Sequence, residues 1–259
     1  MTHSLDGHVA LITGSTSGIG LGIARELSRH GARVILNGIE AASEGNAIAA
    51  TFGGNAVYRQ ADLSRTVAVE ALMAQAEMAF GRLDILVNNA GIQFVSPLAD
   101  FPPEKYDLII ALNQSSVFHT TRLALPMMRR VGRGRIINIA SAHGLVGSPF
   151  KSAYVAAKHA VVGLTKVTAL ETAEENITAN AICPGYVLTP LVEAQIDAQA
   201  RAHSIAREAV VRDVLLAQQP NKKFASVEEI GALCAFLASD AAASITGAAL
   251  PVDGGWTAH

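Results

Sequence analysis

The chain has 259 residues, of which half are hydrophobic and 16% are charged, and its formal net charge is -2. This length fits one large α/β domain, and the charge balance offers none of the basic surface that nucleic acid binding requires. Cys183 and Cys234 lie far apart and outside any Cys or His cluster, so we expect neither a disulfide framework nor a metal site, and a cytoplasmic location. Since no run of about 18 apolar residues is present, we expect no membrane span.

Short apolar runs alternate with longer segments of helical period, which is typical of βαβ units around a buried parallel sheet. Strands are expected at Val9 to Thr13, Arg33 to Asn37, Asn55 to Arg59, Ile85 to Asn88, Arg135 to Ala140, Thr178 to Ile182 and Ala249 to Val252. Helices are expected near Ile19 to His30, Ala41 to Phe52, Val67 to Phe80, Pro103 to Val131, Ala153 to Glu174 and Val227 to Ala238. The pattern predicts a single α/β domain over residues 1–259, with a doubly wound sheet of seven parallel strands.

The segment 188–219 departs from this alternation. It has a helical composition but follows a Pro-Gly strand exit at Pro184 and Gly185. In doubly wound folds, ligands bind beyond the carboxyl ends of the strands. We therefore expect the segment to form a lid over the substrate.

A glycine-rich turn joins the first strand to the first helix. Its backbone amides, together with the positive end of the helix dipole, are suited to hold a pyrophosphate. The residues expected to bind a dinucleotide there are Gly14, Ser15, Thr16, Ser17, Gly18, Ile19 and Gly20.

The end of the second strand normally selects between NAD and NADP, because an acid binds a free ribose hydroxyl and a cation binds a phosphate. Here it reads Leu36-Asn37-Gly38-Ile39-Glu40, with no Lys or Arg between Arg33 and Arg59. Ser17, rather than a cation, precedes Gly18. A 2′-phosphate would find no local partner, so NAD is the expected cofactor, although no acid stands at Gly38.

Tyr154 and Lys158 are four residues apart in a helix-compatible segment, so their side chains should project from one face. A nearby ammonium favours ionisation of a phenol, whose ordinary pKa is about 10. The pair is therefore suited to general acid/base chemistry on an alcohol or a carbonyl. Taken alone, the same spacing is also typical of an amphipathic helix surface.

Together these motifs resemble the short-chain dehydrogenase/reductase family over essentially the whole chain. The resemblance implies a Rossmann-like fold, a homotetramer and a catalytic tetrad of Asn113, Ser141, Tyr154 and Lys158. In the tetrad, Lys158 would bind the nicotinamide ribose and lower the pKa of Tyr154, while Asn113 would pair with helix backbone and a water in a proton route. Further cofactor contacts implied by the resemblance are Asp62, Leu63, Asn89, Ala90, Gly91, Tyr154, Lys158, Pro184, Gly185, Val187 and Thr189.

Within the family, several stretches resemble bacterial enzymes that oxidise (R)-3-hydroxybutyrate, among them Asn88 to Gln93, Ile139 to Val146 and Val252 to Ala258. The resemblance implies NAD-dependent oxidation of this hydroxy acid to acetoacetate. It also implies a substrate site made of Gln93, Ser141, His143, Lys151, Tyr154, Tyr186, Gln195 and Trp256.

In that set, Lys151 supplies the cation for the substrate carboxylate. Tyr186 stands where such enzymes tend to carry Trp, so slightly longer hydroxy acids should be accepted. Trp256 is expected either to close the pocket, from its own or a neighbouring subunit, or to serve only in the core.

Two other functions remain open. The first is a reductase of 3-oxoacyl thioesters or another ketone, in which Lys151 and His143 would have no role. The second is a regulator that binds a dinucleotide without chemistry, which an intact tetrad disfavours.

Overall fold

A computed structural model describes residues 5–189, 192–193, 196–197, 200 and 206–258. Its seven strands form one parallel sheet in the order β3-β2-β1-β4-β5-β6-β7. The strands are β1 Val9–Ile12, β2 Arg33–Gly38, β3 Ala56–Gln60, β4 Ile85–Asn88, β5 Gly134–Ile139, β6 Ile177–Pro184 and β7 Ala249–Val252. All seven predicted strands are confirmed, and so is the doubly wound α/β fold.

The helices also follow the predicted order. They are α1 Gly18–Arg29, α2 Ala42–Ala50, α3 Thr66–Phe80, α4 Pro103–Ile110, α5 Ser116–Val131, α6 Ser152–Glu171, α8 Arg207–Ala209 and α9 Val227–Ala238. At the start of α9, the Ser226 hydroxyl accepts from the Glu229 amide while the Glu229 carboxylate accepts from the Ser226 amide.

The prediction of one helix from Pro103 to Val131 is wrong in one respect. A π-helical turn, Ala111–Ser115, separates α4 from α5. Such turns are frequent at functional sites, and this one carries Asn113. Apolar periodicity continues through the turn, which is why the sequence pattern does not reveal it.

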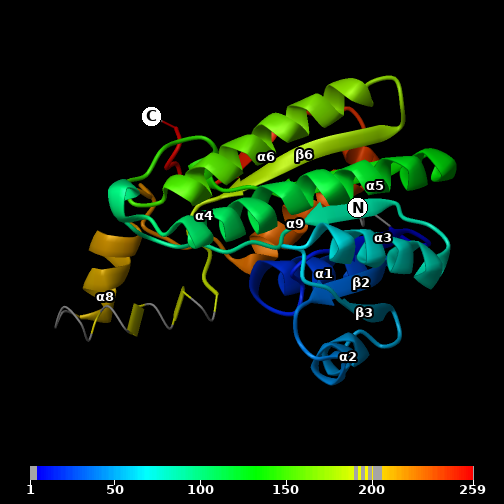
Figure 1. Ribbon diagram of the computed structural model, residues 1–259, viewed down its shortest axis with the longest axis horizontal. Coiled ribbons are helices and arrows are strands. Elements are labelled where there is room, and N and C mark those ends of the chain that lie inside the picture. Colours follow the sequence, from blue (N-terminus) through cyan, green and yellow to red (C-terminus); the bar gives the residue numbers. More distant parts are fainter. Residues whose placement is uncertain (1–4, 190–191, 194–195, 198–199, 201–205, 259) are drawn as a thin grey trace.

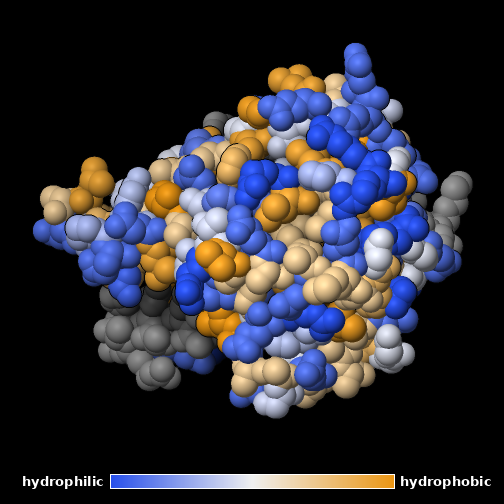
Figure 2. All heavy atoms as spheres, turned by 45° about the vertical axis from the view of Figure 1, so that its right-hand side comes forward, coloured by the Kyte–Doolittle hydropathy of each residue, from blue (hydrophilic) through white to orange (hydrophobic). Residues whose placement is uncertain are grey.

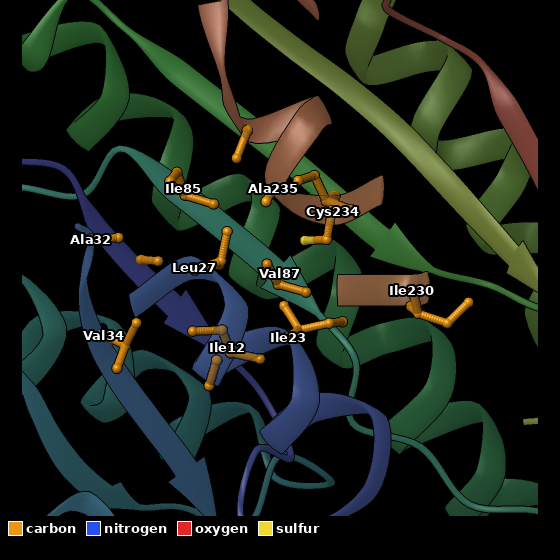
Figure 3. Close-up of a cluster of buried hydrophobic side chains, with 14 of the residues drawn as sticks. Ile12, Ile23, Leu27, Ala32, Val34, Ile85, Val87, Ile230, Cys234 and Ala235 are labelled. Carbon is orange, nitrogen blue, oxygen red and sulfur yellow. The ribbon is translucent and has the colours of Figure 1, made fainter. Parts of the chain in front are cut away.

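Two hydrophobic cores lie on opposite faces of the sheet, because successive side chains of a strand point to opposite sides. Ile12 and Val34 face α1 and α9, whereas Leu11 and Ile35 face α3 and α5. Figure 3 shows the first core, where Ile23 and Leu27 of α1 and Cys234 of α9 pack in one cluster with the strands. The sheet is therefore covered on both faces and leaves its strand ends for ligands.

The strand order reverses between β1 and β4, since the chain builds β2 and β3 on one side of β1 and the later strands on the other. Ligands of open α/β sheets bind at this switch point, beyond the carboxyl ends of the strands. In Figure 1 the chain leaves β6 toward the left of the view, where α8 lies. The predicted lid segment thus starts from the carboxyl end of the sheet.

Figure 2 shows apolar side chains scattered among hydrophilic ones on the face that it presents. Within the described ranges, no helix combines the length and hydropathy needed to cross a bilayer. The same residues contain no group of His, Cys, Asp and Glu side chains suited to hold a metal ion. Both cysteines are buried and unpaired.

Candidate active site

The glycine-rich turn lies directly beyond β1 and leads into α1, as predicted. Ser17 precedes α1 in an extended conformation, and its side chain makes no capping hydrogen bond in the described structure. Gly14 has a φ of 59°, and a Cβ there would lie 2.9 Å from the Cα of Ala90. The first-turn amides of α1 are therefore available to an anion, and the turn fits a pyrophosphate.

Thr13, a residue that sequence reasoning missed, fastens this turn to the end of β4. Its hydroxyl oxygen accepts from the amides of Asn89 at 2.9 Å and Ala90 at 3.0 Å. The Asn89 side chain donates in return to the carbonyls of Thr13 and Gly14. The two predicted cofactor segments are thus joined across the switch point.

Beyond β2, the hydroxyl of Thr16 donates to the Glu40 carboxylate at 2.7 Å. Glu40 was not among the predicted site residues, because the expected position for an acid was Gly38. A spacing of about twenty residues from the glycine turn to an acid was the available signal.

The remaining predicted cofactor residues surround the same end of the sheet. Asp62 is exposed and its carboxylate accepts from the amide and hydroxyl of Ser64, which is a turn interaction, while Leu63 is buried. Thr189 lies against the glycine turn, 3.7 Å from the position of a Cβ at Gly18. Pro184 is the last residue of β6, and the amide of Gly185 donates a hydrogen bond to the Val252 carbonyl. Val187 forms an isolated parallel β-bridge with Ala225.

Tyr154 and Lys158 both lie on α6, one turn apart as predicted. The ammonium of Lys158 is 5.6 Å from the centre of the Tyr154 ring and donates to the Ile139 carbonyl at 2.7 Å. Ser141 follows β5, and its side chain shares a hydrogen bond with Tyr154. The phenol, the serine hydroxyl and the buried ammonium therefore converge at the carboxyl end of β5.

The net shift of the Tyr154 pKa is upward, opposite to the direction expected beside Lys158. Burial raises the pKa of Tyr154, and the hydrogen bond with Ser141 only opposes that rise. Burial also lowers the pKa of Lys158 to about 8. Loss of hydration disfavours the charged form of both groups, and it is the largest cause of each shift.

The expected pairing of Asn113 with helix backbone is wrong, whereas its expected water stays a prediction. Its side chain does not pair with its own helix backbone but with Ile92 on the loop after β4. The Asn113 amide donates to the Ile92 carbonyl at 2.8 Å and its oxygen accepts from the Ile92 amide at 2.9 Å. Asn113 therefore anchors the loop from β4, next to Gly91, to the π-helical turn.

An aromatic cluster borders Tyr154 on the substrate side. The ring of His143 meets Tyr154 edge-on at 6.0 Å and Trp256 at 4.9 Å. Tyr186 stacks on Trp256 with ring centres 6.0 Å apart, and the Lys151 ammonium lies 5.7 Å from the Tyr186 ring. With Ser141, which contacts both Tyr154 and His143, six of the predicted substrate residues thus come together, and Trp256 is supplied by the same chain.

One predicted substrate residue is not brought into this cluster. Gln93 is exposed on the loop after β4, beside the Ile92 backbone that Asn113 holds. Gln195 lies outside the described residues. In the segment 188–219, which was expected to form a lid, α8 and the π-helical turn Val210–Leu215 are described. Val210 and Leu215 pack in one apolar cluster with Tyr186.

His143 is buried, and its Nε2 has no hydrogen-bond partner among the described residues, whereas its Nδ1 lies 3.4 Å from the Ser141 hydroxyl. Burial, followed by repulsion from the Lys151 and His159 charges, lowers the pKa of His143 to about 4. The imidazole is therefore neutral at pH 7, when one of its nitrogens can donate a hydrogen bond.

This shift predicts a loss of stability in acid. Because the folded pKa of about 4 is below the unfolded value of 6.5, the unfolded chain binds more protons between these values. Stability should therefore fall as pH decreases through this window, by about 2 kcal/mol between pH 7 and pH 5. Urea unfolding at both pH values should show a smaller loss for His143→Gln than for the wild type. Equal losses would contradict the assignment. The control is His159→Gln, at an exposed site, which removes only the smallest of the three causes and should keep almost the whole wild-type loss.

Comparisons with known proteins agree with this geometry. The family model described as Enoyl-(Acyl carrier protein) reductase matches residues 14–257. D-beta-hydroxybutyrate dehydrogenase of Rhizobium meliloti is 55% identical, covering 96% of this chain and 98% of that protein. The Cupriavidus necator protein of the same name is also 55% identical, with 98% and 100% covered. A crystal structure of a putative 2-deoxy-d-gluconate 3-dehydrogenase from Agrobacterium tumefaciens with bound NADP has a TM-score of 0.85 at 36% identity, covering 100% and 99% of the two chains.

Proposed function

This chain belongs to the short-chain dehydrogenase/reductase family, and we propose that it is an oxidoreductase that converts (R)-3-hydroxybutyrate to acetoacetate, reversibly, with NAD. The names of its two relatives at 55% identity support the substrate. The cluster around Tyr154 supports it independently, through the chemistry of Lys151.

Lys151 is the observation that carries the proposal. Its ammonium is partly buried against Tyr186, and burial lowers its pKa. In the part of the chain that the structure describes, no carboxylate forms an ion pair with it. A cation withdrawn from water without a counterion is costly, and an anionic substrate offsets that cost. A neutral ketone or a thioester carbonyl would leave Lys151 unpaired, which disfavours the reductase alternative.

We infer the following roles for the residues on the substrate. Lys151 binds the substrate carboxylate, and neutral His143 donates a hydrogen bond to this carboxylate or to a substrate atom next to it. The Ser141 hydroxyl binds the oxygen on C3 and keeps it beside Tyr154. Tyr154 then takes the hydroxyl proton in oxidation, or returns one to the ketone in reduction.

The cofactor would lie across the switch point, with its pyrophosphate at the first-turn amides of α1 and its nicotinamide ribose at Lys158. When bound, it accepts the hydride from C3. We propose NAD because no Lys or Arg lies between Arg33 and Arg59 to receive a 2′-phosphate. We also infer that the segment 188–219 closes over the substrate, supported by the packing of its Leu215 in one cluster with Tyr186.

The direct test is the change in absorbance of NADH with purified protein. We expect reduction of NAD with (R)-3-hydroxybutyrate and far less with the (S) enantiomer or with NADP. Hydroxyvalerate should also be oxidised, because Tyr186 is smaller than Trp. Turnover of 3-oxoacyl thioesters, without turnover of hydroxybutyrate, would favour the reductase instead. Absence of any turnover would favour the regulator. The homotetramer and the cytoplasmic location stay predictions.

A further inference from the structure

Only one of the two carboxylate oxygens of Glu40 has a hydrogen-bond partner among the described residues. Its Oε1 accepts from the Thr16 hydroxyl at 2.7 Å, but its Oε2 is buried and has no hydrogen-bond partner among the described residues. Its backbone is also fixed, because the buried Tyr58 donates its hydroxyl to the Glu40 carbonyl at 2.7 Å. A buried acceptor without a donor is unfavourable, so Oε2 is suited to accept from a ligand.

Gly38 explains why this carboxylate lies beside the glycine turn. A Cβ at residue 38 would collide with Oε2 of Glu40 and would also lie 2.8 Å from Thr16. The carboxylate of Glu40 therefore occupies the space into which a side chain at the end of β2 would project. Residue 38 must lack a side chain for Glu40 to fold back there.

We propose that Glu40 is the residue that reads the adenine ribose, in place of an acid at Gly38. Its Oε2 accepts a hydrogen bond from the ribose 2′-hydroxyl, while Thr16 holds Oε1. This inference rests on the proposed function, because it concerns the cofactor of the same site, and it names the residue that selects NAD.

The charges around Glu40 also favour NAD over NADP. A 2′-phosphate would meet the Glu40 carboxylate at close range, and like charges repel strongly where water is excluded. Glu44, exposed on α2, adds a second negative charge nearby. Arg59 directs its guanidinium to the Tyr58 carbonyl at 2.9 Å. Glu40 would therefore reject NADP in addition to binding NAD.

The test is a binding titration that needs no turnover. The fluorescence of NADH, NADPH and 2′-deoxy-NADH, the last lacking only the adenosine 2′-hydroxyl, gives three dissociation constants. For the wild type, removing the hydroxyl should weaken binding about ten-fold or more, the size of a hydrogen bond to a charged group. In Glu40→Ala, NADH and 2′-deoxy-NADH should bind almost equally. In Glu40→Gln, the preference for NADH over NADPH should fall about ten-fold or more.

Two further variants separate the contact from its surroundings. Glu44→Gln removes an equal charge close by and should keep the full effect of the 2′-hydroxyl. Gly38→Ala should displace Glu40 and reproduce the loss seen in Glu40→Ala, while thermal unfolding shows that each variant is folded. A folded Glu40→Ala that still distinguishes NADH from 2′-deoxy-NADH as the wild type does would overturn the inference alone. A wild type that prefers NADPH would instead overturn the proposed cofactor.

Discussion

Replacing Tyr154 with phenylalanine should lower kcat for hydroxybutyrate oxidation by about 10²- to 10⁴-fold, because general base catalysis contributes on that scale. The ring and its edge contact with His143 would remain, and only the hydroxyl that hydrogen-bonds with Ser141 would be lost. NADH binding, followed by fluorescence, should change far less than kcat, because most of the predicted cofactor contacts remain. A folded variant that keeps wild-type turnover would show that Tyr154 is not the base.

The pH profile of the wild type gives a second readout of Tyr154. Oxidation requires the phenolate, and burial raises the pKa of Tyr154. The rate of oxidation should therefore increase with pH on the alkaline side of neutrality, whereas reduction, which requires the phenol, should persist at lower pH. In Tyr154→Phe this dependence should disappear from the residual rate. A dependence that is unchanged in the variant would point to another titrating group.

Replacing Lys151 with methionine should lower kcat/KM for hydroxybutyrate by about 10- to 150-fold, the cost of a charged hydrogen bond of about 1.5–3 kcal/mol. Methionine keeps most of the apolar stem beside Tyr186 and removes only the charge. The loss should appear mainly in KM, since the ammonium holds the carboxylate before and during the reaction. NADH binding should not change, because the cofactor is assigned to Lys158.

A neutral substrate makes this test specific to charge. With 3-hydroxybutyramide, which lacks the carboxylate, wild type and Lys151→Met should have similar kcat/KM values. The matched control is Lys166→Met, at an exposed lysine of α6, the helix that Lys151 precedes, and it should behave as the wild type. If Lys151→Met lost activity equally on the acid and the amide, Lys151 would have a structural role and the carboxylate assignment would fail.

Most of the fold follows from local patterns. Each predicted strand is a short apolar run, and each is found within two residues of its expected bounds. The exception is the segment from Pro103 to Val131, where the π-helical turn holds Asn113 toward Ile92. A shift of one residue in a helical hydrogen-bond pattern leaves no mark on apolar periodicity, so only the tertiary contact reveals it.

The candidate site divides in the same way. Motif spacing was enough to place Tyr154 one turn from Lys158, whereas a shared role of the glycine turn and Asn89 was implied only by the family resemblance. It gave no account of Glu40, whose carboxylate reaches the glycine turn only because Gly38 leaves the space empty. Whether a side chain can reach across a loop depends on the size of the side chains around it. A linear motif does not contain this information.

By itself, the sequence determined the strands, the doubly wound sheet and the identity of the residues with the right chemistry, because strand periodicity and helix spacing are local properties. Only the tertiary structure decided their electrostatics. Burial raises the pKa of Tyr154 and lowers those of Lys158 and His143, so the net shift of the phenol is opposite to the expected one. Hydration is lost through packing by segments distant in sequence, such as the one that brings Trp256 onto His143, so no local pattern predicts it.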